Sequence, residues 1–208
     1  MTRPDAVVFD IGNVLMYWDP EGFYDRRLGE AGRRRLFAET GIEAMNLAVD
    51  AGAPFRATVE AHAAAHPAWR DDILCWYHNW IEMAAPRIEG SIALLRALRA
   101  KGVPVLALTN FGDDSFTYAQ TQYDFLNEFD RTFVSGRMGV IKPDAEIYRQ
   151  LEAATGIAPN GLIFTDDRAE NIAAAAARGW RVHLFTNWEG WAERLVAEGL
   201  LSRAEAGL

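Results

Sequence analysis

Cysteine is almost absent from this sequence: Cys75 is the only one among 208 residues. A single cysteine excludes an intrachain disulfide and a thiolate metal cluster, and a reducing, cytoplasmic setting is the simplest interpretation. Long apolar runs are missing as well. The first residues, MTRPD, lack the apolar segment of a secretory signal, and no later stretch approaches the ~20 residues of a membrane span. We therefore expect no association with a membrane.

Positive charge is also in short supply. The chain has 21 Lys and Arg against 29 Asp and Glu, which gives a net charge of -8. An acidic chain is a poor electrostatic partner for nucleic acid and for anionic membranes, so neither is an expected partner. Half of the residues are apolar, and a chain of this length with that composition can bury a sizeable core.

The apolar residues occur in short runs that alternate with helical patterns. Residues 6–10 read AVVFD, an apolar run without alternation, which is typical of a strand buried on both faces of a parallel sheet. Further buried or short strands are predicted over 103–110, 132–136, 161–167 and 180–185. Helices are predicted over 90–102, 113–129, 143–156, 169–179 and 188–199, with Pro143 in a first helical turn.

This alternation predicts an α/β fold, a doubly wound, Rossmann-like parallel sheet. Residues 19–87 interrupt it, because they are rich in Ala, Glu and Arg, have a helical pattern and contain no convincing buried strand. The sequence therefore predicts two domains. Residues 1–17 and 88–208 form the sheet-containing core, and residues 18–87 form an inserted α-helical cap over its crevice.

Polar side chains gather where the predicted strands end. They are Asp10, Thr109, Asn110, Asp166 and Asp167. Lys142 lies just before a predicted helix amino terminus, a position that favours anions. The carboxyl ends of strands in an open α/β sheet border the crevice that binds ligands, so we expect these groups to meet there.

Their chemistry suits a phosphate ester. Three crowded carboxylates repel one another unless a cation intervenes, and oxygen ligands of this kind suit Mg²⁺. With the metal and Lys142 offsetting charge, an anionic phosphate could approach a carboxylate nucleophile. Each residue alone is an ordinary feature of a strand end, a turn or a helix start; their joint placement carries the prediction.

Four segments resemble the motifs of the haloacid dehalogenase superfamily, in order and over nearly the whole chain: FDIGNVL, ALTN, GVIKPDAEIY and FTDDRAENI. The form DxGNV is similar to a phosphatase-like branch that includes sugar-phosphate phosphatases. The resemblance implies a helical cap inserted after the first motif. It implies as catalytic residues the nucleophile Asp10, the phosphoryl-binding Thr109 and Asn110, and Lys142. It implies Mg²⁺ bound by Asp10, the Gly12 carbonyl and Asp167, with Asp166 as a ligand or just outside the ligands.

Gly12 departs from the pattern of that superfamily. Most of its phosphatases carry a second Asp two residues after the nucleophile, which protonates the leaving oxygen and later activates water. Gly12 has no side chain that could do this. Because general acid–base catalysis typically contributes about 10²–10⁴-fold, the substitution bears directly on function.

Three functions follow from this departure. The first is a Mg²⁺-dependent phosphatase for a small phosphate monoester, for example a sugar phosphate, whose acid comes from Asp19, another cap residue or the substrate. The second is a 2-haloacid dehalogenase that uses Asp10 without metal, although such enzymes lack the acid pair. The third is a non-catalytic phosphate-binding or interaction protein. A receiver domain is discarded, because its acid pair would precede the acceptor Asp.

The predicted cap has one aromatic stripe, formed by Trp69, Ile73, Trp76, Tyr77 and Trp80. Packing within the cap is the simplest role for it, but one or two of these rings, or Trp18, could line the substrate pocket. Arg26 and Arg27 could face a substrate anion. His62 and His66 have a spacing that could hold a metal, although a structural role is favoured. Cys75 is interpreted as a small buried hydrophobe.

Overall fold

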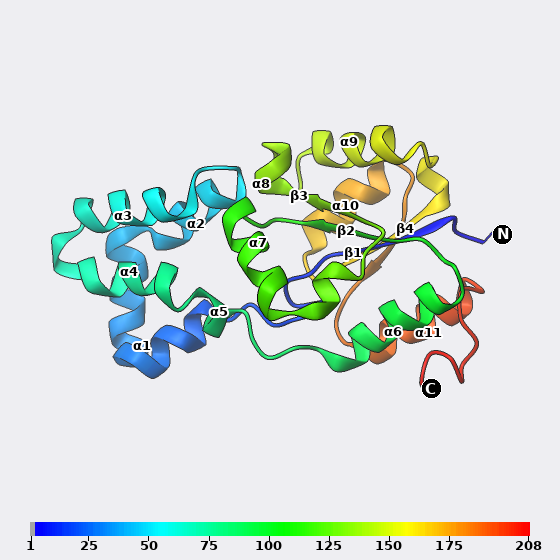
Figure 1. The fold of residues 1–208 in the computed structure, drawn as a ribbon, viewed down its shortest axis with the longest axis horizontal. Coiled ribbons are helices and arrows are strands. Elements are labelled where there is room, and N and C mark those ends of the chain that lie inside the picture. Colours follow the sequence, from blue (N-terminus) through cyan, green and yellow to red (C-terminus); the bar gives the residue numbers. More distant parts are fainter. Residues whose placement is uncertain (1–2) are drawn as a thin grey trace.

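The computed structural model describes residues 3–208 and contains one five-stranded parallel sheet (Figure 1). The strand order is β3-β2-β1-β4-β5. The strands are β1 (Ala6–Phe9), β2 (Val105–Thr109), β3 (Arg131–Val134), β4 (Leu162–Asp166) and β5 (Arg181–Leu184). This order, with crossovers on both sides of β1, confirms the predicted doubly wound parallel sheet.

The three central strands are buried along their whole length. Every residue of β1, β2 and β4 is buried, which explains why their sequences AVVF, VLALT and LIFTD show no apolar–polar alternation. The register pairs Phe9 with Ala107 on one side and with Thr165 on the other. The carboxyl ends of these strands therefore lie side by side at one edge of the sheet.

Helices cover both faces of the sheet (Figure 1). On one face, α6 (Glu89–Ala100), α7 (Asp113–Gln122) and α11 (Trp188–Ala197) pack against a core that includes Val7 and Phe9. On the other, α9 (Ala145–Thr155) and α10 (Ala169–Ala177) pack against a cluster that includes Val8. Successive residues of β1 thus point into opposite layers, as the strand geometry requires.

Three predicted boundaries are wrong. The helix predicted over 113–129 is broken at Tyr123, which is extended, and continues as the short helix η2 (Asp124–Asn127). The strand predicted over 132–136 ends at Val134, because Ser135 begins α8 (Ser135–Met138). Pro143 is not in a first helical turn: α9 begins at Ala145, with the Asp144 side chain accepting from the Glu146 N–H. A further short helix, η3 (Pro159–Gly161), precedes β4.

The segment between β1 and α6 is helical and lies to one side of the sheet (Figure 1). It contains α1 (Pro20–Thr40), α2 (Ile42–Asp50), α3 (Phe55–Ala65), η1 (Pro67–Trp69), α4 (Arg70–His78) and α5 (Trp80–Met83). The division of the chain into 1–17 with 88–208 and an inserted 18–87 stays a prediction. We use the word cap for residues 18–87.

The chain enters and leaves the cap through two segments that pair with each other. Met16 and Arg87 form an antiparallel bridge. The Ile88 N–H donates to the Leu15 carbonyl at 2.8 Å, and the Asp19 N–H donates to the Met83 carbonyl at 2.7 Å. The two crossings therefore run side by side as a short two-stranded ribbon.

The aromatic stripe mainly packs within the cap, as the simpler interpretation predicted. Trp76 is 1% exposed and stacks on Tyr24, with ring centroids 6.0 Å apart. Tyr77 lies against Phe55, with centroids 5.0 Å apart. Cys75 is only half-buried, and this burial raises the pKa of its thiol. Among the described residues, no helix is long and apolar enough to cross a membrane.

Candidate active site

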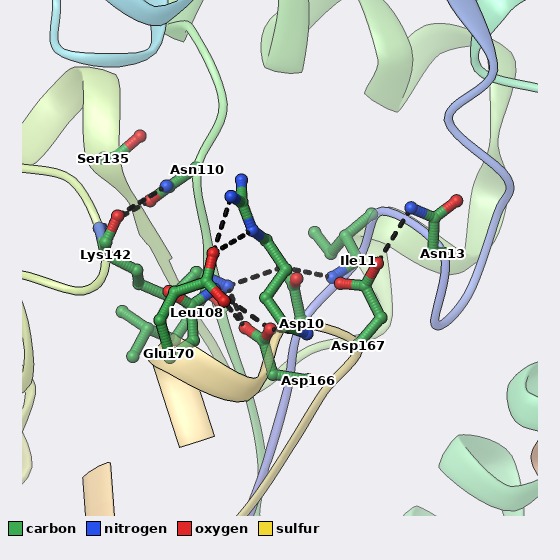
Figure 2. A network of polar contacts seen from close by, with 12 residues as sticks. Asp10, Ile11, Asn13, Leu108, Asn110, Ser135, Lys142, Asp166, Asp167 and Glu170 are labelled. Atoms are coloured by element: carbon green, nitrogen blue, oxygen red, sulfur yellow. Dashed lines mark hydrogen bonds and ion pairs between the residues drawn. The ribbon is translucent and has the colours of Figure 1, made fainter. Parts of the chain in front are cut away.

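Most of the predicted site residues meet at the carboxyl edge of the sheet, and Figure 2 shows five of them: Asp10, Asn110, Lys142, Asp166 and Asp167. Asp10 directly follows β1, Thr109 is the last residue of β2, and Asp166 is the last residue of β4. Lys142 comes from the connection between α8 and α9 and reaches into the same group. All four side chains are buried, although three of them are charged.

Lys142 connects two of the three carboxylates. Its Nζ lies 2.8 Å from Asp10 Oδ1 and 2.6 Å from Asp166 Oδ2, and it also donates to the Leu108 carbonyl at 2.9 Å. These contacts use the three donors of an ammonium group. Burial alone would lower the pKa of Lys142, but attraction to Asp10 and Asp166 outweighs burial and raises it. Lys142 is therefore a fixed cation at neutral pH.

Asp166 is fully committed to holding neighbouring groups. Its Oδ1 accepts from the Arg168 N–H at 2.8 Å, and both of its oxygens accept from the Asn171 amide at 3.0 Å. With Lys142 on Oδ2, the carboxylate has little accepting capacity left, and its side chain is 0% exposed. Asp166 is thus better placed to orient Lys142 than to meet a ligand.

Asp10 and Asp167 keep oxygens that face the site. Asp10 Oδ1 accepts from the Ile11 N–H at 2.8 Å and from Lys142. Burial raises the pKa of the Asp10 carboxyl, Lys142 opposes the rise, and the Asp166 charge adds to it. Asp167 is half-buried and accepts from Asn13 Nδ2 at 2.9 Å, and burial raises its pKa as well. Both carboxyls would be stabilised in their ionised form by a bound cation.

The site has oxygen atoms that could act as ligands of a hard cation. Oxygens of Asp10, Asp166 and Asp167 all lie within 4.8 Å of one another. Gly12 borders the same cavity. Three carboxylates against the single ammonium of Lys142 leave a net negative charge, which a divalent cation would balance. An all-oxygen set of this kind would suit Mg²⁺, and the assignment of Asp10, the Gly12 carbonyl and Asp167 as its ligands stays a prediction.

Asn13 and Asn171 are site residues that the sequence reasoning missed. Asn13 has a φ of 55°, a left-handed conformation that Asn adopts more readily than most residues. In this conformation it donates to Asp167 and accepts from the Trp18 N–H at 3.0 Å. Two sequence features could have indicated them. Asn13 lies in the turn of FDIGNVL, and Asn171 lies five residues after Asp166, in the first turn of α10, from where its side chain reaches back to Asp166.

Asn110 contacts the backbone of Lys142 with its side-chain amide. Its Oδ1 accepts from the Lys142 N–H at 2.7 Å and its Nδ2 donates to the Lys142 carbonyl at 3.0 Å. Both ends of its amide therefore hold the Lys142 backbone. Thr109 is 1% exposed and borders the cavity. The assignment of Thr109 and Asn110 to phosphoryl binding stays a prediction.

A cavity of about 190 Å³ opens above Asp10. Its floor contains Asp10, Thr109, Lys142 and Asp167 of the core. Its opposite wall comes from the cap, with Trp18, Asn46, Leu47, Asp50 and Trp80. The Trp18 and Trp80 rings lie 5.6 Å apart, and Trp80 lies 5.1 Å from the ring of Phe111, which also borders the cavity. Trp18 and one residue of the stripe, Trp80, therefore do line the pocket.

Other cap candidates lie elsewhere. Arg27 pairs with Asp72 at 2.8 Å, and Arg26 is exposed; neither borders the cavity. The Asp19 carboxylate is exposed and caps α1 by accepting from the Gly22 N–H at 2.8 Å. The rings of His62 and His66 lie 4.5 Å apart, and within residues 3–208 neither belongs to a group of three or more potential metal ligands.

A family model for haloacid dehalogenase-like hydrolases matches residues 4–179. The chain belongs to this family of enzymes. Residues of this hydrolase are 34% identical, over 87 positions, to a sesquiterpene phosphatase of Aspergillus oryzae; the match covers 42% of the chain and 44% of that protein. A drimenol cyclase of Aspergillus calidoustus is 24% identical, and the match covers 98% of this chain and 38% of that protein. The chain thus spans less than half the length of the curated relatives it matches.

Solved structures share the fold of this hydrolase. A haloacid dehalogenase family enzyme of Bacteroides thetaiotaomicron superimposes with a TM-score of 0.73 and 19% identity, covering 93% of this chain and 99% of that one. A structure of that enzyme contains magnesium and inorganic phosphate. An L-2-haloacid dehalogenase of Xanthobacter autotrophicus superimposes with a TM-score of 0.62 and 18% identity, covering 99% and 87%. At these identities the likeness concerns the fold alone.

Proposed function

We propose that this hydrolase is a Mg²⁺-dependent phosphatase that acts on a small phosphate monoester through a phosphorylated Asp10. The observation that carries the proposal is the contact of 2.8 Å between Asp10 and the buried Lys142, in one cavity with Asp167. The phosphatase among its relatives supports the same reaction, as does the neighbouring structure with magnesium and phosphate.

The residues of the chain divide the work of phosphoryl transfer. Lys142 and the Ile11 N–H hold Asp10 Oδ1, and Lys142 is itself held by Asp166. An Asp10 oxygen attacks phosphorus and the bond to the ester oxygen breaks; water then attacks the same phosphorus and releases Asp10 and inorganic phosphate. Lys142 stabilises the negative charge that builds up on the phosphoryl oxygens. When bound, Mg²⁺ supplies further charge neutralisation at this point.

Dehalogenation is the second candidate. Its leaving halide needs no proton, which Gly12 would permit, and a dehalogenase shares the fold. However, a 2-haloacid brings a second carboxylate next to Asp10, Asp166 and Asp167, whose oxygens already crowd within 4.8 Å. A non-catalytic role ranks third, because Lys142 contacts both Asp10 and Asp166, and an Asp167 oxygen lies within 4.8 Å of those of both acids.

The cavity walls favour an uncharged leaving group. Among the described residues that border the cavity, the cations are Lys142 and Arg168, and both come from the core. The cap instead presents the rings of Trp18 and Trp80, which can contact the face of a sugar or an apolar alcohol. We propose a small phosphorylated molecule of this kind as the substrate, with sugar phosphates as the first class to test. A cytoplasmic location, with no nucleic-acid or membrane partner, is part of the same proposal.

A hydrolysis screen tests this function. Purified protein is assayed against sugar phosphates, alkyl and isoprenoid phosphates, p-nitrophenyl phosphate and 2-haloacids, each with Mg²⁺ and with a chelator. We expect phosphate release that requires Mg²⁺. Halide release in the chelator would replace the proposal with dehalogenation, and silence on every substrate would favour the non-catalytic role.

Exchange of Asp167 tests its proposed role as a metal ligand. Asp167→Asn should weaken Mg²⁺ binding by about tenfold or more, because a charged oxygen ligand is lost while the contact with Asn13 can remain. Calorimetric titration with Mg²⁺ in the presence of inorganic phosphate measures this directly. The matched control is Glu170→Gln, a nearby surface carboxylate paired with Arg168, which should bind Mg²⁺ as the wild type does. Equal affinities in both variants would remove Asp167 as a ligand.

A further inference from the structure

The proposed reaction leaves one proton without a source. When phosphorus moves from an alkyl ester to Asp10, the departing oxygen needs a proton, and Gly12 offers none. The core carboxylates cannot serve: Asp10 is the nucleophile, Asp166 is saturated with hydrogen bonds, and Asp167 has the metal role. Asp19 points out to solvent as a helix cap. The acid must therefore be sought on the cap side of the cavity.

Asp50 is the carboxyl group on that side. It is the last residue of α2, it is half-buried, and it borders the same cavity as Asp10 and Lys142. Among the described residues that line this cavity, Asp50 is the one carboxylic acid that the cap contributes. A leaving group bound between the floor of the cavity and the aromatic residues of the cap would have Asp50 beside it, on the cap side of the cavity.

The end of α2 is fixed to the core. The Ser135 hydroxyl donates to the Asp50 carbonyl at 2.6 Å and accepts from the Phe111 N–H at 2.9 Å. Val49 packs so closely on Gly112 that a Cβ at Gly112 would lie 2.5 Å from Val49 Cγ1. Asp50 is thereby held beside the loop that follows β2, the loop that also presents Asn110 and Phe111 to the cavity.

The surroundings of Asp50 favour its protonated form. Burial raises the pKa of the Asp50 carboxyl to about 7, with a hydrogen bond from the Gly112 backbone opposing the rise. The side-chain contact at the carboxyl is the neutral amide of Asn46, which donates to Oδ2 at 3.0 Å. A carboxyl that is protonated in part at neutral pH can both give and take a proton, whereas an ordinary Asp is almost fully ionised there.

We propose that Asp50 is the general acid–base residue of this enzyme, a role that rests on the proposed phosphatase function. As an Asp10 oxygen bonds to phosphorus and the bond from phosphorus to the ester oxygen breaks, the Asp50 carboxyl gives its proton to that oxygen, which leaves as an alcohol. Asp50, now a carboxylate, accepts a proton from the water that attacks the phosphorylated Asp10. Inorganic phosphate and the free Asp10 carboxylate are released, and Asp50 is protonated again.

The test compares leaving groups in Asp50→Asn. The value of kcat/KM covers the steps up to the transfer of phosphorus to Asp10, so for an alkyl or sugar phosphate it should fall by about 10²–10⁴-fold. For p-nitrophenyl phosphate it should stay within about threefold, because nitrophenolate leaves without a proton. The control Asp71→Asn removes an exposed cap carboxylate and should change neither value.

A second variant tests the same role in the other direction. A Cβ at Gly12 would meet its nearest neighbour, Trp18 Cβ, at 3.8 Å, so a side chain can start there without a clash. Adding Gly12→Asp to Asp50→Asn should restore kcat/KM for alkyl phosphates by about tenfold or more. It should do so with little effect on p-nitrophenyl phosphate.

The outcomes separate this role from the proposed function. Equal losses on both substrates in Asp50→Asn, or no loss on either, would overturn Asp50 as the proton donor while leaving the phosphatase intact. A wild-type protein that hydrolyses no phosphate ester would instead remove the phosphatase itself, and the acid with it. If Asp50→Asn does not fold, the single variant Gly12→Asp takes its place. Its rate on alkyl phosphates should exceed that of the wild type by less than tenfold, because Asp50 already supplies an acid. A larger gain would overturn the role of Asp50.

Discussion

Asp10→Asn should reduce kcat for phosphate-ester hydrolysis by more than about 10⁴-fold, since losing a nucleophile removes the covalent step itself. An amide oxygen is a far weaker nucleophile than a carboxylate. The fold should persist, because Asn can still accept from the Ile11 N–H and Lys142 keeps Asp166 and the Leu108 carbonyl as partners. Rapid acid quenching with ³²P-labelled substrate checks the step: wild type should carry a hydroxylamine-sensitive label, and the variant none.

The exchange of Asp10 also has a clear contrary result. A rate within tenfold of wild type, or a label that persists in the variant, would show that another residue attacks phosphorus. Asp5→Asn is a suitable control, because Asp5 lies at the opposite end of β1 and is exposed. It should leave both the rate and the label unchanged.

Lys142→Met should be the most destabilising of the exchanges considered. Removing the ammonium leaves Asp10 and Asp166 buried side by side without their shared cation, and breaking a buried ion pair in this way costs about 3–5 kcal/mol of unfolding free energy. Met fills much of the same space, so the loss would be electrostatic rather than a cavity effect. Activity should fall together with stability. Urea unfolding in the presence of a chelator measures the stability term without a metal.

The pH dependence identifies the cause of that loss. Burial already raises the folded-state pKa of Asp10 above its ordinary value of 3.8, and Lys142 is the group that lowers it. Without Lys142 that pKa rises further, so between 3.8 and the new value the folded protein binds a proton that the unfolded chain releases. Because the wild-type carboxyl already has a pKa of about 7, the folded variant binds more protons than the folded wild type only above that pH. The deficit of Lys142→Met should therefore shrink as pH falls towards about 7 and stay nearly constant below it.

A surface lysine provides the comparison for this exchange. Lys101 pairs with Glu205 at 2.9 Å, and both side chains are more than a third exposed. Lys101→Met should leave stability and its pH dependence close to wild type, since exposed pairs contribute little. A deficit in Lys142→Met that did not change with pH would mean that lost packing, and not two unpaired carboxylates, destabilises the variant.

The sheet was predictable from sequence because its central strands are buried on both faces. AVVF, VLALT and LIFTD lack alternation, and that pattern has few other interpretations once helices separate the runs. The predicted ends of helices and strands were wrong where a single residue changes the direction of the chain. Ser135 ends β3 by using its hydroxyl to join the Phe111 N–H to the Asp50 carbonyl, a contact between segments far apart in sequence. No local pattern announces such a contact.

The site was predictable to the extent that strand ends define it. Asp10, Thr109 and Asp166 follow from the parallel order alone, and Lys142 does meet two of the carboxylates. Asp50 could not be found in this way. It sits at the end of a cap helix, and its place at the cavity depends on how α2 packs against the core, which periodicity within the helix does not determine.

The paired crossings have a consequence for protein engineering. The two ends of the helical insertion are neighbours, because the Asp19 N–H donates to the Met83 carbonyl. Excising the intervening helices would require only a tight hairpin turn to reconnect the chain, without stretching either end. Such a minimal protein would keep the groove floor open to solvent and would report how far metal and phosphate are captured by the sheet edge on its own.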